Sequence, residues 1–263
     1  MTVPRAVVLD IEGTTGSIDH VHQVLFPYAR RRLAGWLDTH RGSARHQELL
    51  DAVRSHRQAP GLDEPAVLRT LAEWADADVK AAPLKALQGL IWAEGFADGS
   101  LSGHVYPEVP PVLREWHQAG IALYIYSSGA AGAQRDWFAH SGHGDLTPLL
   151  QGYFDLESAG GKRAAGSYRT IASAIGLPAG QLLFLSDVGE ELDAARSAGW
   201  RAVGVRRPGD PRGAEITGHP TVAALDRVRF DVPQTVSPAV SPAGSPTVPP
   251  NRAPKSPAKE GQQ

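Results

Sequence analysis

The 263-residue chain contains no cysteine. It therefore has no disulfide, no thiolate metal ligand and no cysteine nucleophile. It also lacks any apolar run close to the ~20 residues that a membrane-spanning helix needs. The residues from Thr2 to Arg5 lead directly into the first apolar segment, without the pattern of a signal peptide. These absences favour a cytoplasmic protein.

An excess of charge of one sign is missing as well. The chain has 26 Lys and Arg against 28 Asp and Glu, a formal net charge of −2. Such a balance gives no electrostatic reason to expect nucleic acid or a membrane surface as a partner. Hydrophobic residues make up 42% of the chain, enough for a proper core. No pattern indicates an oligomer, and a monomer is the default expectation.

The composition changes after Val232. Residues 233–263 contain eight prolines and no Leu, Ile or aromatic residue. A segment of this kind cannot bury enough apolar surface to offset the conformational entropy lost on ordering. We predict that residues 231–263 form a disordered, proline-rich tail, so that the working part of the protein is about residues 4–230.

The most informative stretch of the chain is AVVLDIEGTT, from Ala6 to Thr15. Its apolar start, Ala6 to Leu9, is typical of a short strand buried on both faces, as in a parallel sheet. Asp10 and Glu12 follow at the carboxyl end of that strand, where open α/β sheets bind ligands. Asp10 has the chemistry of a covalent nucleophile and of a Mg²⁺ ligand, and Glu12 that of a general acid and base. Alternatively, both carboxylates merely cap a following helix.

Between residues 20 and 99, apolar residues recur at helical spacing and never alternate as in a strand. The predicted helices cover 21–37, with a kink or restart at Pro27, then 44–56, and the segments after Pro65 and Pro83. About 80 residues of helix are too long for an ordinary crossover between strands. We therefore predict a helical cap domain, residues 20–99, inserted after the first strand. It would serve as a lid over the site, or else only as scaffold on the sheet.

From residue 100 onward, predicted strands and helices alternate. The strands are expected at 121–126, 153–155, 181–185 and 201–205, and the helices at 109–119, from 130, from about 162 to 175, and from about 189 to 198. This alternation predicts an α/β fold, a doubly wound parallel sheet of Rossmann-like type. Its core would consist of residues 1–19 and 100–230.

Further polar side chains stand at or near the ends of these strands. Ser127 and Ser128 follow one strand and suit an anion site, or alternatively a plain helix cap. Lys162, beside a Gly-Gly pair, can reach a phosphate, although a solvated lysine is the simpler interpretation. Asp187 follows another strand, and Glu191 lies one helical turn beyond it. With the two carboxylates of the first strand, these groups make up the inventory that phosphoryl transfer needs.

This order of motifs resembles the haloacid dehalogenase-like (HAD) hydrolase superfamily. Most of its phosphatases carry Asp-x-Asp in the first motif, whereas Asp-x-Glu-Gly-Thr-Thr resembles the enolase-phosphatases, or acireductone synthases, of L-methionine salvage. The resemblance covers about residues 5–210. Its segments are LDIEGTT (9–15), VHQVLFPYA (21–29), PLKALQGLIWAEG (83–95), GHVYPEVPP (103–111), LYIYSSG (123–129), FLSD (184–187) and ELDAA (191–195).

The resemblance implies a bifunctional enzyme with one Mg²⁺ per subunit. Its substrate would be 2,3-diketo-5-methylthiopentyl-1-phosphate, which it would first enolise and then dephosphorylate through an aspartyl-phosphate to give an acireductone. Asp10 would be the nucleophile and a Mg²⁺ ligand. Glu12 would give its backbone carbonyl to the metal and its side chain to acid/base work, and Asp187 would complete the metal site.

The remaining roles are carried over in the same way. Ser127 and Ser128 would hold the phosphate, and Lys162 would neutralise it during catalysis. Glu191, from its spacing, would orient the lysine or the waters on the metal. The group that takes the carbon-bound proton is not assigned, and both Glu12 and a residue of the lid are open.

Other interpretations share part of the pattern. A HAD phosphomonoesterase acting on another small phosphorylated metabolite has the same core motifs and differs only in the lid. A non-catalytic phosphate-binding module needs no nucleophile, and a dehalogenase needs no Mg²⁺ site, so neither accounts for the carboxylates. Three histidines near the predicted lid, His20, His22 and His104, are of a type that is more often structural or solvent-facing than substrate-binding.

Overall fold

A computed structural model describes residues 2–209 and 216–230. The predicted disordered tail, residues 231–263, lies outside the described residues and stays a prediction. None of the described helices is long and apolar enough to cross a bilayer.

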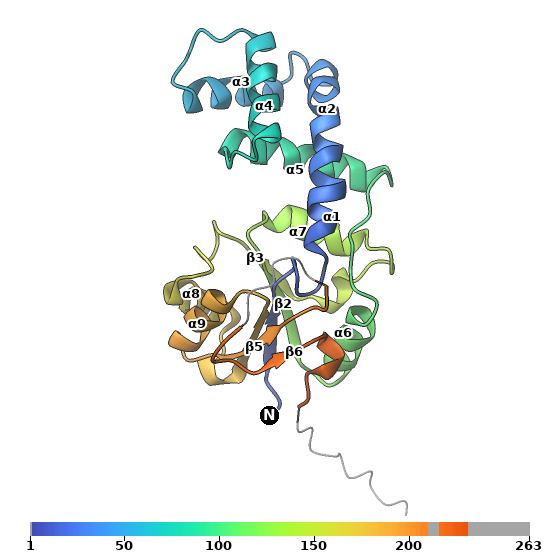
Figure 1. Ribbon diagram of the computed structural model, residues 1–263, viewed down its shortest axis with the longest axis vertical. Coiled ribbons are helices and arrows are strands. Elements are labelled where there is room, and N and C mark those ends of the chain that lie inside the picture. Colours follow the sequence, from blue (N-terminus) through green and yellow to red (C-terminus); the bar gives the residue numbers. More distant parts are fainter. Residues whose placement is uncertain (1, 210–215, 231–263) are drawn as a thin grey trace, which may run out of the picture. The chain divides into compact units, whose positions relative to one another are not determined.

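Six strands of the described chain form one sheet in the order β3-β2-β1-β4-β5-β6, and each neighbouring pair is parallel. The strands are β1 (Ala6–Leu9), β2 (Ala122–Tyr126), β3 (Gly152–Phe154), β4 (Leu182–Ser186), β5 (Arg201–Val205) and β6 (Thr221–Val222). This order confirms the predicted doubly wound parallel α/β fold (Figure 1). The edge strand β6 was not predicted, because two residues are too short to show a pattern.

The apolar run of β1 is explained by cover on both faces of the sheet. Val7 and Leu9 belong to one buried cluster, to which α6 (Val109–Gln118) and α7 (Ala131–Ala139) also contribute. Ala6 and Val8 belong to a second cluster, together with residues of α8 (Ala165–Ile175) and α9 (Gly189–Ser197). Figure 1 shows α6 and the α8–α9 pair on opposite sides of the sheet. Because side chains of a strand alternate between faces, every residue of β1 is buried.

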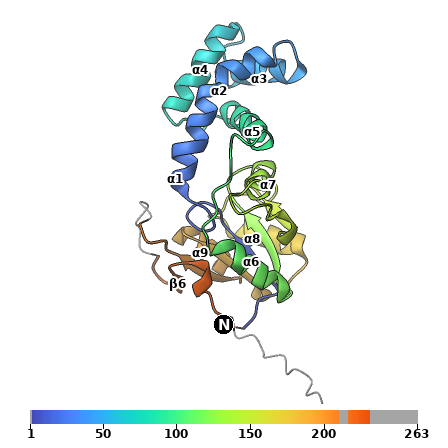
Figure 2. The same ribbon diagram turned by 90° about the vertical axis from the view of Figure 1, so that its right-hand side faces the viewer.

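Helices fill the chain between β1 and β2, and within these described residues no strand longer than an isolated bridge occurs. They are α1 (Ile18–His20), a π-helical turn (Val21–Leu25), α2 (Phe26–Thr39), α3 (Ala44–His56), α4 (Glu64–Asp76) and α5 (Ala82–Ala97). Pro27 lies in the first turn of α2, directly after the π-helical turn, and the backbone stays helical through Leu25 and Phe26. The predicted kink or restart is therefore a change of hydrogen-bond pattern without a break in the helix. Helices α2 to α5 pack on one another (Figure 2).

Short 3₁₀ turns complete the described elements, at Thr147–Leu149, Ala179–Gln181 and Leu225–Arg227. The division of the chain into a core domain and a separate cap domain of residues 20–99 stays a prediction.

The two passages between the sheet and helices α2 to α5 both lie against Trp137 of α7. A Cβ at Gly16, in the first passage, would be 2.9 Å from the Trp137 ring, and one at Gly103, in the second, 2.0 Å from the Trp137 carbonyl oxygen. The passages also contact each other, since the backbone N–H of Ser17 donates to Nδ1 of His104 at 3.1 Å. The junction is therefore closely packed.

The first prediction concerns Gly103. A methyl group has no room there, because its neighbour is backbone and cannot swing away. We expect Gly103→Ala to lower the free energy of unfolding by about 1–3 kcal/mol, measured by urea unfolding. Gly89→Ala in α5 is the control, since nothing lies within 4 Å of a Cβ there. That alanine should raise the same quantity by about 0.5–1 kcal/mol. Equal stability of the two variants would contradict this packing.

A second prediction concerns pH. Nδ1 of His104 accepts the Ser17 N–H only while it is unprotonated. Burial lowers the pKa of His104 below its ordinary 6.5, and the neighbouring His20 lowers it further. Because the unfolded chain then binds the proton more readily, this contribution to stability is complete above pH 6.5 and is lost as the pH falls through the folded-state pKa.

Wild-type melting temperature should therefore fall more between about pH 7.5 and pH 5 than that of His104→Asn. The Oδ1 of asparagine can accept the same N–H at either pH. If the melting temperatures of the two proteins change equally over this pH range, His104 is not the cause of the pH dependence.

Candidate active site

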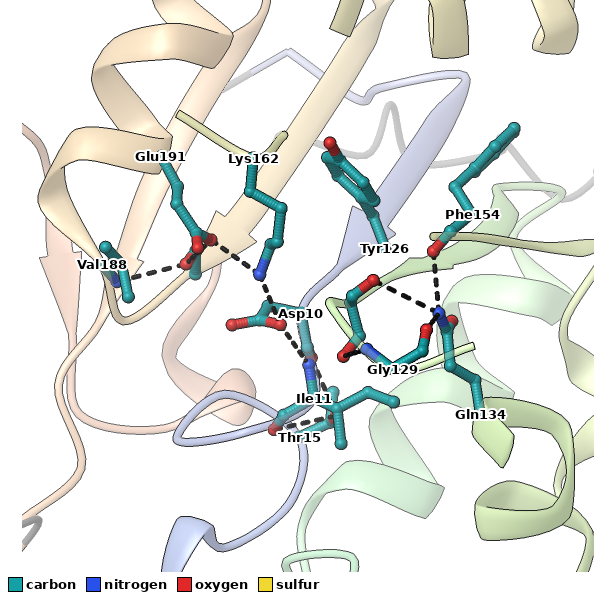
Figure 3. Close-up of polar contacts among 12 residues, drawn as sticks. Asp10, Ile11, Thr15, Tyr126, Gly129, Gln134, Phe154, Lys162, Val188 and Glu191 are labelled. Atoms are coloured by element: carbon teal, nitrogen blue, oxygen red, sulfur yellow. Dashed lines mark hydrogen bonds and ion pairs between the residues drawn. The ribbon is translucent and has the colours of Figure 1, made fainter. Parts of the chain in front are cut away.

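Three buried charged side chains meet at the carboxyl end of β1. Nζ of Lys162 lies 2.7 Å from Oδ1 of Asp10 and 2.7 Å from Oε2 of Glu191 (Figure 3). The exposed fractions are 4% for Asp10, 6% for Lys162 and 8% for Glu191. Glu191 thus contacts Lys162 directly, as the prediction that it orients the lysine requires.

Burial and the neighbouring charges together shift the pKa values of Lys162 and Glu191. Burial by itself lowers the pKa of Lys162, but the charges of Asp10 and Glu191 outweigh it and raise the pKa above its ordinary 10.5. Burial, with the charge of Asp10, raises the pKa of Glu191 against the opposing attraction of Lys162. Lys162 is therefore cationic throughout the physiological range, and removal of its charge would leave two carboxylates facing each other.

Two tyrosine hydroxyl groups hold the backbone of the loop that carries Lys162. Lys162 lies in the loop before α8, not in the helix itself. Tyr168 donates to the carbonyl of Lys162 at 2.8 Å, and Tyr126 donates to the carbonyl of Gly160 at 2.7 Å. Gly160 has φ +97°, a conformation that a side chain resists. On the other side, the hydroxyl of Ser186 donates to Oε2 of Glu191 at 2.8 Å.

The two oxygens of Asp10 have different surroundings. Oδ1 accepts both the Lys162 ammonium and the backbone N–H of Ile11, the latter at 2.8 Å. Among residues 2–209 and 216–230, none donates a hydrogen bond to Oδ2. One oxygen therefore fixes the side chain, and the other is left for a ligand.

The loop after β2 is held by Gln134 of α7. Its Nε2 donates to the carbonyls of Gly129 at 2.7 Å and Phe154 at 2.8 Å (Figure 3). Ser127 is buried, and its hydroxyl accepts the N–H of Gly129 at 3.3 Å. Ser128 is exposed. Because β2 is the parallel neighbour of β1, this loop stands beside Asp10.

The oxygen donors at these strand ends fit Mg²⁺. β4 pairs with β1 on the other side, so Asp187 follows the strand next to Asp10. Mg²⁺ is usually bound through one or two carboxylates and keeps several waters. Asp10, Asp187 and the backbone carbonyl of Glu12 supply only oxygen ligands. No cluster of three or more His, Cys, Asp or Glu side chains suited to a metal occurs in the described ranges, and this donor set does not require one.

Contacts in the structure thus join Asp10, Lys162 and Glu191 directly, while strand order places Ser127 and Asp187 on either side of β1. The catalytic, phosphate-binding and metal-binding roles of all the predicted residues stay predictions. His20 and His104 contact backbone groups of the packed junction, at Ser102 O and Ser17 N.

Sequence reasoning missed several side chains that hold backbone carbonyls around the site. Gln134 looks like a surface residue of a helix, and its burial depends on the neighbouring loops. Lys85 of α5 donates to the carbonyl of Ser128 at 2.7 Å, and its position inside the PLKALQGLIWAEG segment was the only available signal. Arg207, just after β5, donates to the carbonyl of Thr14.

The triad gives a third prediction. Lys162→Met should lower the free energy of unfolding at neutral pH by about 3–5 kcal/mol, the usual cost of leaving a buried charge without its partner. Glu191 would then have a pKa still further above its unfolded value. Its protonation therefore stabilises the folded state below that pKa, and the loss should shrink as the pH falls.

Urea unfolding at about pH 7 and pH 5 measures this effect. Lys162→Met combined with Glu191→Gln is the matched variant, because it removes the second charge and should recover part of the stability at neutral pH. A loss in Lys162→Met that is equal at both pH values would refute the charge argument.

Comparison with known proteins agrees with this geometry. The family model of haloacid dehalogenase-like hydrolases matches residues 4–199. A Nocardia farcinica protein named enolase-phosphatase E1 is 55% identical over 206 residues, which cover 78% of this chain and 88% of that protein. A Pseudomonas aeruginosa protein of the same name is 49% identical over 225 residues, 86% of this chain and 97% of that protein.

A solved structure is similar as well. The UTR4 protein of Saccharomyces cerevisiae superposes with a TM-score of 0.71 at 28% identity, covering 86% of this chain and all of that one. The positions from Asp10 to Glu191 lie inside the residues that the family model matches. The family expected from the motifs is thereby confirmed, and the chain belongs to the haloacid dehalogenase-like hydrolases and, within them, to the enolase-phosphatase E1 family.

Proposed function

We propose that this hydrolase enolises 2,3-diketo-5-methylthiopentyl-1-phosphate and then removes its phosphate, releasing the acireductone of L-methionine salvage. The observation that carries the proposal is the asymmetry of Asp10, whose Oδ1 is fixed by Lys162 and the Ile11 N–H while Oδ2 is left for a ligand. A binding module has no need of a carboxylate held in this way beside an incoming phosphate. The two bacterial relatives, both named enolase-phosphatase E1, support the same activity.

In the proposed phosphatase step, Asp10 acts as the nucleophile. Its carboxylate forms a bond to phosphorus while the bond between phosphorus and the substrate's bridging oxygen breaks. Glu12 gives a proton to that leaving oxygen. Water then attacks the aspartyl-phosphate, Glu12 accepts the proton of the water, and inorganic phosphate leaves with Asp10 restored.

The surrounding groups lower the electrostatic cost of this step. Lys162 stays cationic and lies beside Asp10, so it offsets charge where the phosphate arrives. Ser127, Ser128 and backbone N–H groups after β2 are the proposed phosphate donors. Mg²⁺, held by Asp10, Asp187 and the Glu12 carbonyl, would offset the charge that develops on the carbonyl oxygen during enolisation and on the phosphoryl oxygens during transfer.

We also propose that α2 to α5 act as a lid. Lys85 at the start of α5 reaches the carbonyl of Ser128 in the proposed phosphate loop. An enolised intermediate needs protection from water, and a lid that closes on the phosphate loop would supply it.

The test, and the fourth prediction, follow both products on the same sample. Phosphate release and the ultraviolet absorbance of the enol are measured on the diketone phosphate, with and without Mg²⁺. Wild type should give both products only with Mg²⁺. Asp10→Asn should lower the rate of phosphate release by at least about 10³-fold, because it removes the nucleophile.

Asp51→Asn, the same change at an exposed aspartate of α3, is the control and should behave as wild type. If the wild-type enzyme hydrolyses simple phosphomonoesters but never forms the enol, its substrate is another phosphorylated metabolite. Phosphate release by Asp10→Asn at the wild-type rate would show that Asp10 is not the nucleophile.

A further inference from the structure

A buried arginine that the predicted reaction does not use lies just after β5. Nε and Nη2 of Arg207 both donate to the carbonyl oxygen of Thr14, at 3.2 and 2.6 Å. Nη1 pairs with Glu108, at the start of α6. The guanidinium also lies over the ring of Tyr106, 3.9 Å from its centroid. One side chain, 6% exposed, thus joins three segments that are far apart in the sequence.

The Thr14 carbonyl belongs to the loop that follows Glu12. Within this loop the carbonyl of Ile11 accepts the N–H groups of Thr14, Thr15 and Gly16, at 3.1, 2.9 and 2.7 Å. The loop closes through the N–H of Gly13, which donates to the Gly16 carbonyl at 2.7 Å. The result is a compact turn directly beyond Asp10 and Glu12, and Arg207 holds one of its carbonyls from outside.

Stability alone does not account for an arginine in this place. A buried guanidinium loses its hydration, and apolar residues of similar volume often stabilise a protein as well as a buried ion pair does. What arginine provides is geometry, since its planar fork can hold a carbonyl and a carboxylate at fixed angles at the same time. Lysine has one nitrogen and cannot reproduce this arrangement.

We propose that Arg207 is a positioning residue for Glu12. By holding Thr14, it fixes the turn and with it the direction from which Glu12 donates and accepts protons. This inference rests on the proposed function, in which Glu12 protonates the leaving oxygen and later accepts a proton from water. A displacement of about 1 Å in a group of this kind can cost about 100-fold in rate.

The experiment, and the fifth prediction, compare Arg207→Met and Arg207→Lys with Arg201→Met. Arg201 stands at the opposite end of β5 and also holds a backbone carbonyl, that of Thr2, so it is a matched control away from the site. On the diketone phosphate with saturating Mg²⁺, kcat of Arg207→Met should fall about 10- to 100-fold. KM should change by less than about threefold, because the phosphate donors are untouched.

A second substrate separates positioning from a loss of folded protein. 4-Nitrophenyl phosphate has a leaving group that needs no proton, so only its second step, the attack of water, depends on Glu12. In stopped flow, Arg207→Met should release the first equivalent of nitrophenol at close to the wild-type rate and then turn over slowly. Unfolded enzyme would lower the burst amplitude and the later rate in the same proportion.

Arg207→Lys, which keeps the charge, should show the same burst with a smaller loss of steady-state rate, and it carries the test if the methionine variant does not fold. Wild-type kinetics in both Arg207 variants, or a first turnover slowed as much as the later ones, would overturn the inference while the proposed function stands. If wild type releases phosphate from neither substrate, the proposed function fails, and the inference fails with it.

Discussion

The contact of Lys162 with two buried carboxylates is the interaction on which the candidate site depends. Each of these groups would cost several kcal/mol to bury alone, and only their mutual attraction offsets that cost. Two carboxylates and one ammonium still leave a negative charge beside the proposed phosphate site. The lysine alone cannot offset this charge and that of a phosphate. A divalent cation bound to the oxygen donors that follow β1 and β4 is the simplest way to offset both.

The parallel sheet explains why so few residues suffice. β1 lies between β2 and β4, and all three end at the same edge. The proposed nucleophile after β1, the proposed phosphate donors after β2 and the proposed metal ligand after β4 are then neighbours, although Asp10 and Asp187 are far apart in sequence. Buried strands fix these positions, because a shift of one residue would move Val7 and Leu9 into the cluster that packs around Ala6 and Val8, where the neighbouring side chains do not match them.

Much of this arrangement was predictable from the sequence, and the reason differs between residues. Asp10, Ser127 and Asp187 each follow an apolar run, so strand pattern alone places them at the sheet edge. Lys162 and Glu191 lie in a loop and on a helix, where the strand pattern gives no direction. The role of Lys162 was predicted from its Gly-Gly pair and from resemblance to a family, and that of Glu191 from its spacing.

The residues that were missed share a different property. Gln134 and Arg207 bind backbone carbonyls, and a carbonyl is present at every position, so nothing in the sequence marks the partner. Arg207 and Thr14 are also 193 residues apart, and their contact exists only after the sheet has formed. Contacts of this kind must be seen in a structure.

These carbonyl contacts also differ in strength, and the difference indicates which part of the site can move. Arg207 and Gln134 are buried, so breaking their hydrogen bonds would leave polar groups without partners inside the protein. Lys85 is exposed, and water can replace its single bond to Ser128 at little cost. The loops that follow Asp10 and Ser127 are therefore held rigidly, whereas the contact between α5 and the Ser128 carbonyl is weak enough for the proposed lid to open for substrate and close again.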